Sequence, residues 1–175
     1  EGARAIRWFS EMVHRFANTK EEIASPLPAD LRVVPYGEVD TEKQRLLHNH
    51  CFADHWGSAA FIEVTWRERI EASSVRMAAS EAVIDEHGVP VAYQISEEFP
   101  QDVETLGNLR WLGTLGVHRA HRGKGLATHL IQRHLLHVDS PNVRSDGAIV
   151  SLAGLSGRVI FFWLIVRLNH GQQLQ

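Results

Sequence analysis

The sequence has few cysteines and little net charge. Cys51 is the only cysteine among 175 residues, which excludes a disulfide framework or a cysteine-based zinc site within one chain and favours a reducing, cytoplasmic environment. Lys and Arg number 18 against 21 Asp and Glu, for a formal charge of −3. This balance gives no general attraction to nucleic acid or membrane, so any anion site must be local.

Long apolar runs are also missing. The most apolar run, residues 159–166, has eight residues, far fewer than the roughly 20 that a membrane-spanning helix needs. The first residues contain no apolar region typical of a signal peptide. The five tryptophans are spread along the chain without a basic face beside them. We therefore expect a cytoplasmic protein that binds neither membrane nor nucleic acid.

The periodicity of apolar residues predicts a mixed α/β fold. A helix is expected from residue 41 to about residue 53, capped by Asp40 or Thr41, with Thr41 and Gln44 matching a capping box. A second helix begins near Leu126, and residues 61–72 fit either a helix or a strand. The strands are expected at residues 31–36, 81–85, 89–96, 110–117, 135–140 and 158–168.

Three segments follow from composition. Residues 17–30 are polar and contain two prolines, which is typical of a linker. Residues 1–16 before it would then belong to a different packing unit. Residues 31–175 are expected to form the main domain.

The loop "HRAHRGKGLATHL", residues 118–130, has the composition of an anion site at a helix N-terminus. Gly123 and Gly125 would let a ligand approach the backbone, and Arg122 and Lys124 would add positive charge. The spacing matches neither the Walker A motif nor the dinucleotide fingerprint. From the residues alone, a phosphate site and a charged turn remain equally good interpretations.

The longer run "LGVHRAHRGKGLATHLI" resembles the acetyl-CoA-binding motif of the GNAT acyltransferase superfamily, Gln/Arg-x-x-Gly-x-Gly/Ala after a strand that ends in valine. Arg122, Gly125 and Ala127 occupy the motif positions. The resemblance covers residues 31–142 and is greatest to the C-terminal domain of tandem GNAT proteins of the mycothiol-synthase type. It implies that residues 1–16 hold a remnant strand of a preceding GNAT domain.

This resemblance implies an N-acetyltransferase with acetyl-CoA as co-substrate and no metal. The acceptor would be a primary amine of a small molecule or peptide, which attacks the thioester directly, so Cys51 need not be catalytic. The residues that would bind acetyl-CoA are Leu115, Gly116, Val117, Arg122, Gly123, Lys124, Gly125, Leu126, Ala127 and Asn142.

An alkyl ammonium group must lose its proton before it can attack, so the reaction needs a base. Glu97 and Glu98 lie where the family often supplies a carboxylate that faces the acceptor. They fit equally well as two solvated glutamates in a turn. His118 is a second candidate base, or a charged loop residue.

The second half of the sequence departs from the family pattern and predicts a truncated fold there. Asn142 and Ala148 match loosely, but Leu152 stands where a tyrosine is expected. About a dozen residues would be missing between Leu126 and the strand at 135–140, judged against ordinary helix lengths. These departures favour an alternative function, a catalytically impaired module that binds CoA or a partner domain.

Eleven histidines raise the question of a metal site. The densest group is "HNHCFADH", with His48, His50, Cys51 and His55. No second pair of ligands follows at the spacing of a zinc finger. We expect histidines on helix faces and no metal.

Overall fold

The computed structural model describes residues 9–15, 25–55, 58–101, 109–138 and 147–153. It confirms the mixed α/β fold. Short 3₁₀ segments occur at Tyr36–Glu38, Met77–Ala79 and Arg119–His121. The helices and strands are β1 (Phe9–Arg15), β2 (Leu31–Pro35), α1 (Thr41–Cys51), α2 (Glu63–Ile70), β3 (Glu81–Asp85), β4 (Pro90–Glu97), β5 (Leu109–Val117), α4 (Leu126–Val138) and β6 (Gly147–Ala153).

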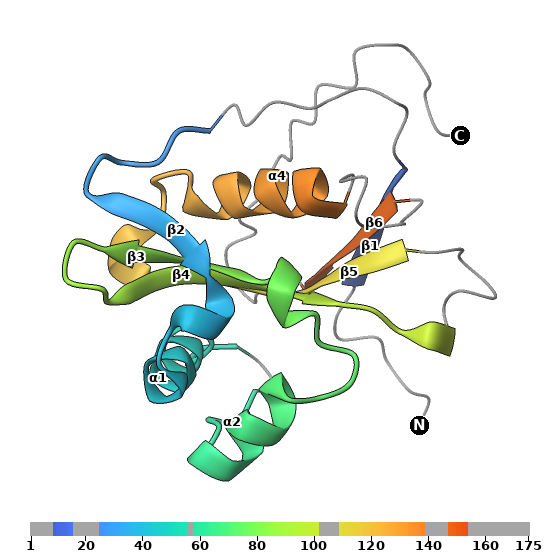
Figure 1. The fold of residues 1–175 in the computed structure, drawn as a ribbon, viewed down its shortest axis with the longest axis horizontal. Coiled ribbons are helices and arrows are strands. Elements are labelled where there is room, and N and C mark those ends of the chain that lie inside the picture. The colour runs from blue at the N-terminus through green and yellow to red at the C-terminus, as the bar shows by residue number, and fades with distance from the viewer. Residues whose placement is uncertain (1–8, 16–24, 56–57, 102–108, 139–146, 154–175) are drawn as a thin grey trace, which may run out of the picture.

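The strands form one sheet in the order β1-β6-β5-β4-β3-β2. Neighbouring strands are antiparallel except β5 and β6, which run parallel. In Figure 1, α4 lies over one face of the sheet, whereas α1 and α2 lie below the other. The strand expected near the start of the chain is β1, and it pairs with β6 over its whole length. Its origin in a preceding domain remains a prediction.

Helix α1 begins because Asp40 caps it. The Asp40 carboxylate accepts hydrogen bonds from the backbone N–H groups of Glu42 and Lys43, which satisfies two donors that the first turn cannot pair internally. Gln44 does not complete a capping box. Its side-chain amide donates to the carbonyl oxygens of Tyr36 and Val39 instead.

Two apolar clusters hold the helices to the sheet. The first joins α1 and α2 to their face of the sheet, and Trp66 of α2 is buried there with Tyr93 and Ile95 of β4. The second lies under α4, where Leu126 and Leu130 contact the neighbouring strands. Because β4 is buried along its whole length, the residues at its end have positions fixed by packing on both faces.

The segment 61–72, which fitted either a helix or a strand, contains the helix α2. Its one fully buried residue is Trp66, while Glu63 and Arg67 form an ion pair one turn apart on the exposed side. Such a pair stabilises a helix.

The strand predicted at residues 135–140 was wrong. Leu135–Val138 form the last turn of α4, because the buried residues Leu126, Leu130, Ile131 and Leu135 continue one helical face. Helix α4 therefore has 13 residues, and the apparent loss of a dozen residues is also wrong.

The next strand is β6, which contains Leu152, paired with Ser10 of β1. The strand predicted at 158–168 lies outside the described residues. Among the helices described, none combines the length and apolar character needed to cross a membrane.

Candidate functional site

Strands β5 and β6 pair along only part of their length. Their parallel ladder runs from Leu109↔Gly147 to Leu112↔Val150. Beyond this point β5 continues to Val117, still paired with β4, and β6 continues to Ala153, still paired with β1. In the described part of the sheet, the two strands thus have backbone edges that face each other without pairing. Such an edge can bind an extended ligand through backbone hydrogen bonds.

A bulge marks the place where the two strands separate. The register between β4 and β5 shifts between Ile95↔Thr114 and Ser96↔Leu112, which leaves Gly113 as the additional residue on β5. Glycine inside a strand often marks a bulge or a close approach of another group.

The carboxylate of Glu97 lies directly on the backbone of Gly113. A Cβ atom at Gly113 would be 1.7 Å from Oε2 of Glu97 and 2.5 Å from its Cδ. Only glycine leaves room for this carboxylate. The side chain of Glu97 is 9% exposed, so the structure holds a nearly buried carboxylate at the start of the unpaired edge.

Two polar side chains contact this carboxylate, and a third contacts one of those two. Nη1 of Arg69 lies 3.0 Å from Oε1 of Glu97, and Nη2 of the same guanidinium lies 3.4 Å from the Thr114 hydroxyl. The hydroxyl of Ser74 donates to Oε1 of Glu97 at 3.4 Å. The arginine comes from α2 and the threonine from β5, so this group joins the helix to the bulged strand.

Glu98 has a different environment from its neighbour. Its Oε2 accepts from Nε of Arg76 at 3.2 Å and from Nη2 of Arg110 at 2.8 Å. Burial would raise the pKa of the Glu98 carboxyl, but the two guanidinium groups more than offset it and hold that pKa below its ordinary value. Glu98 is therefore paired with two arginines. Glu97 is paired with one arginine and lies where β5 and β6 separate.

The basic loop follows the C-terminal end of β5. After the 3₁₀ turn Arg119–His121, two glycines adopt positive φ angles, 77° at Gly123 and 80° at Gly125, and α4 begins at Leu126. No atom lies within 4 Å of the Cβ position at Gly123. The position of a side chain at Gly123 thus lies in open space beside the N-terminus of α4, where the first N–H groups of a helix have no partner within it.

Arg122 and Lys124 contribute differently to this loop. The guanidinium of Arg122 donates to the carbonyl oxygens of Val117 and Cys51 at 3.1 and 3.2 Å, so it joins the end of β5 to the end of α1. Lys124 is exposed at the loop surface. The next two predicted residues, Leu126 and Ala127, are buried and anchor the first turn of α4.

Ser25, before β2, lies on this first turn. Its backbone carbonyl contacts Nδ1 of His129 at 2.5 Å, its N–H donates to Oε1 of Gln132 at 3.2 Å, and its hydroxyl donates to the carbonyl oxygen of Gly125 at 3.4 Å. A Cβ atom at Gly125 would be 2.8 Å from the Ser25 hydroxyl oxygen. Part of the predicted linker therefore packs against the loop.

The strand residues between the bulge and the loop are largely covered by side chains. Leu115 and Val117 pack with the cluster under α4. Gly116 faces the other side, where a Cβ atom would meet Cε1 of Tyr93 at 2.5 Å and Sγ of Cys51 at 3.2 Å. Burial raises the pKa of the Cys51 thiol to about 12. The thiol is therefore protonated at neutral pH and is a poor nucleophile.

The histidines of "HNHCFADH" lie in different surroundings. His48 is buried, and its Nδ1 lies 2.5 Å from the Tyr93 hydroxyl. His50 stacks on His118 with ring centroids 3.9 Å apart. Within the described ranges, no three His, Cys, Asp or Glu residues are placed to hold a metal ion.

His118, the alternative base, has a local structural role. Its Nδ1 accepts a hydrogen bond from the N–H of Ala120 at 3.3 Å, which caps the 3₁₀ turn. Burial, followed by the nearby His50, His121 and Arg122, lowers the pKa of His118. The ring is thus neutral at pH 7, in agreement with a nitrogen that accepts a hydrogen bond.

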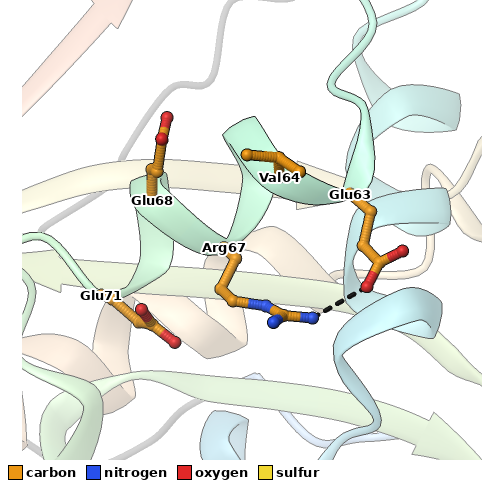
Figure 2. A pocket seen from close by; sticks show the side chains of 5 residues that line it. All are labelled: Glu63, Val64, Arg67, Glu68 and Glu71. Carbon is orange, nitrogen blue, oxygen red and sulfur yellow. Dashed lines mark hydrogen bonds and ion pairs between the residues drawn. The ribbon is translucent and has the colours of Figure 1, made fainter.

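A shallow hollow on the exposed side of α2 is separate from these features. Figure 2 shows Arg67 reaching toward Glu63, with Val64, Glu68 and Glu71 along the same helix. None of the five lining residues belongs to β5 or to the basic loop. Mixed charges on a single helix face do not by themselves make a binding site.

Sequence reasoning did not identify Arg69, Ser74 or Gly113 as site residues. Arg69 lies in α2, whose type the sequence left open, and three residues after the buried Trp66 it is placed near the sheet. The predicted site residue Asn142 lies outside the described residues.

Comparison with known proteins gives one family and a common fold. Residues 42–145 match the sequence model of the acetyltransferase (GNAT) family. A GCN5-related N-acetyltransferase from Sphaerobacter thermophilus superposes with a TM-score of 0.68 at 15% identity, over 87% of this chain and 44% of that one. The chain thus spans less than half the length of that structure. No curated protein sequence matches.

Two further structures have the same fold. A GNAT family acetyltransferase from Brucella melitensis, in complex with acetyl-CoA, has a TM-score of 0.55 at 14% identity, over 75% of this chain and 79% of its own. A tandem GNAT protein from the clavulanic acid biosynthesis pathway has a TM-score of 0.56 at 16% identity, over 89% of this chain and 47% of its own.

Proposed function

This chain belongs to the acetyltransferase (GNAT) family, and we propose that it transfers an acetyl group from acetyl-CoA to a primary amine of a small molecule or peptide. The observation that carries the proposal is the separation of β5 from β6 at Gly113, with the Glu97 carboxylate on the bulge. An unpaired strand edge begins at this carboxylate and leads to a basic, glycine-containing loop.

The two ends of this edge suit the two ends of acetyl-CoA. Gly113 and Val117 are four residues apart on a strand, which places them about 13 Å from each other. The backbone edge of Leu115, Gly116 and Val117 would bind the extended arm of the ligand. The amides from Arg122 to Ala127, with the charge of Lys124, would bind the pyrophosphate, because Gly123 leaves open space there.

Glu97 is the better candidate for the base. The amine nitrogen attacks the thioester carbonyl carbon, the carbon–sulfur bond breaks, and the departing CoA thiolate takes up the proton that the nitrogen loses as it becomes an amide. Before the attack the ammonium group passes a proton to the Glu97 carboxylate. Glu98 is less suited to this role because two arginines hold it in its charged form.

The family resemblance also supports finer proposals. Asn142 would contact acetyl-CoA beyond the described residues. The chain would be the C-terminal domain of a tandem protein of the mycothiol-synthase type, with a cytoplasmic location in line with its lone cysteine. The likeness to a tandem structure over less than half of that chain supports this assignment.

A thiol-release assay tests the proposed reaction. Wild-type protein is incubated with acetyl-CoA and a panel of primary amines, and free CoA is measured beside the Glu97→Gln and Glu98→Gln variants. We expect amine-dependent release that Glu97→Gln lowers about 100-fold or more, the ordinary contribution of a positioned base. Glu98→Gln should stay within about tenfold of wild type. Absence of amine-dependent release across the panel would contradict the proposal.

A further inference from the structure

Arg69 forms an ion pair with Glu97, the carboxylate that the proposed reaction needs. Its Nη1 lies 3.0 Å from Oε1 of Glu97, and its Nη2 reaches the Thr114 hydroxyl at 3.4 Å. The Ser74 hydroxyl also donates to Oε1 of Glu97 at 3.4 Å. An ammonium group that binds at Oε1 of Glu97 would therefore compete with Arg69 for this oxygen and could replace it there.

That replacement would leave the arginine without its charged partner. The Arg69 side chain is 28% exposed, so it is only partly solvated. Its guanidinium cannot lose its charge at any ordinary pH, and Thr114 offers only a neutral hydroxyl. An unpaired charge in such a place is costly. An acceptor that carries its own anion would remove this cost, since it would supply one partner to each residue.

The present partner of Arg69 indicates which anion suits its guanidinium. The guanidinium already binds a carboxylate here, and its planar fork is suited to carboxylate oxygens. The pyrophosphate of CoA is a poor alternative, because the loop lies beyond Val117, about 13 Å along β5 from the bulge. Arg69 is therefore at the reacting end of the site.

We propose that the acceptor is an α-amino acid, whose ammonium group binds Glu97 and whose carboxylate binds Arg69. This inference rests on the proposed function. The two opposite charges of the amino acid would then replace the contact between Glu97 and Arg69. One ion pair within the protein would give way to two ion pairs with the ligand. A plain alkylamine would satisfy Glu97 alone and would leave Arg69 unpaired.

The test measures binding rather than turnover. The full chain is saturated with CoA, which cannot donate an acetyl group, and is titrated calorimetrically with matched pairs: phenylalanine and phenethylamine, leucine and isoamylamine, lysine and cadaverine. We expect at least one amino acid to bind about tenfold or more tightly than its decarboxylated partner. Arg69→Gln should abolish that difference, and Arg69→Lys should restore part of it.

Arg67→Gln is the matched control, because Arg67 lies on the same helix but pairs with Glu63 on the exposed side. It should keep the wild-type preference. Equal binding within every pair, no binding of any amino acid, or a preference that survives Arg69→Gln would overturn the inference. A separate titration with acetyl-CoA reports on the proposed function. If acetyl-CoA fails to bind, the amino acid titrations of the free protein still decide the role of Arg69.

Discussion

At the scale of single residues, the site depends on the contact between Glu97 and Gly113, which lie far apart in the sequence. Glu97 ends β4 and Gly113 lies in β5, and the carboxylate of the first occupies the space where the second would carry a side chain. The glycine thus fixes where the charge lies. Neither residue alone would indicate this arrangement.

Gly113→Ala should therefore damage both stability and activity. The added methyl group would displace the Glu97 carboxylate or push the strands apart, and overpacking of this kind costs about 1–3 kcal/mol. Urea unfolding measures the loss. Gly37→Ala is a suitable control, because the nearest atom to its Cβ position is Cγ of Met77 at 3.3 Å, in a flexible side chain. A Gly113→Ala variant as stable as the control would contradict the described position of Glu97.

His48 should make stability depend on pH. Burial, followed by the charges of Arg69 and His55, lowers its pKa from 6.5 to about 4 in the folded protein. The unfolded chain therefore binds more protons between these values, and stability falls as the pH drops from about 6.5 to about 4. His48→Gln should flatten this part of the unfolding free-energy curve against pH, even if the variant is less stable throughout.

The comparison for this experiment is His87→Gln, which changes a histidine with a side chain 77% exposed. It should leave the slope of the unfolding free energy between pH 6.5 and pH 4 unchanged. Carboxyl groups that titrate in the same range contribute equally to both variants, so their contribution cancels in the comparison. Equal slopes for His48→Gln and wild type would show that His48 does not bind its proton as the buried position requires.

At the scale of the elements, the helix boundaries follow from local hydrogen bonding. The sequence left open whether Asp40 or Thr41 caps α1, and the described contacts place the cap on Asp40. Asp40→Ala should cost about 1 kcal/mol of stability, a usual value for the loss of an N-cap. Thr41→Ala should change stability by less than half of that. Thermal or urea unfolding of both variants checks the order, and a larger loss for Thr41→Ala would reassign the cap.

Local patterns predicted most elements well but failed where two patterns overlap. The hairpin of β3 and β4 was predictable from alternating apolar residues around a turn, and both strands form. The end of α4 was not, because "LLHV" fits a short strand as well as a helical turn. Only the continued burial of one helical face, through Leu130 to Leu135, decides between them.

The site shows the same limit. The loop with Arg122, Gly123 and Gly125 was predictable because its residues are adjacent in sequence. The group around Glu97 was only half predictable, since Arg69 comes from a helix 28 positions earlier in the chain. Contacts between such distant segments depend on the packing of α2 against the sheet, and no local pattern records them.

At the scale of the whole molecule, β5 connects the two halves of the proposed chemistry. The middle of β5 carries the bulge under Glu97, and its C-terminal end leads to the loop before α4. Helices α1 and α2 cover one face of the sheet and α4 covers the other (Figure 1). The group around Glu97 and the basic loop therefore adjoin the same strand but are positioned by different helices. Each can be altered without changing the other.

Binding of acetyl-CoA at the loop around Gly123 is tested most directly by calorimetry on three proteins. Gly123→Asp places a carboxylate in the open space of the loop, whereas Gly88→Asp places one at a similar φ, 72° against 77°, in the turn between β3 and β4. Gly125 is less suitable because its Cβ position meets Ser25. We expect wild type and Gly88→Asp to bind acetyl-CoA with affinities within about threefold of each other, and Gly123→Asp to bind at least about tenfold more weakly. Equal binding by the two variants, or no binding by wild type, would contradict this expectation.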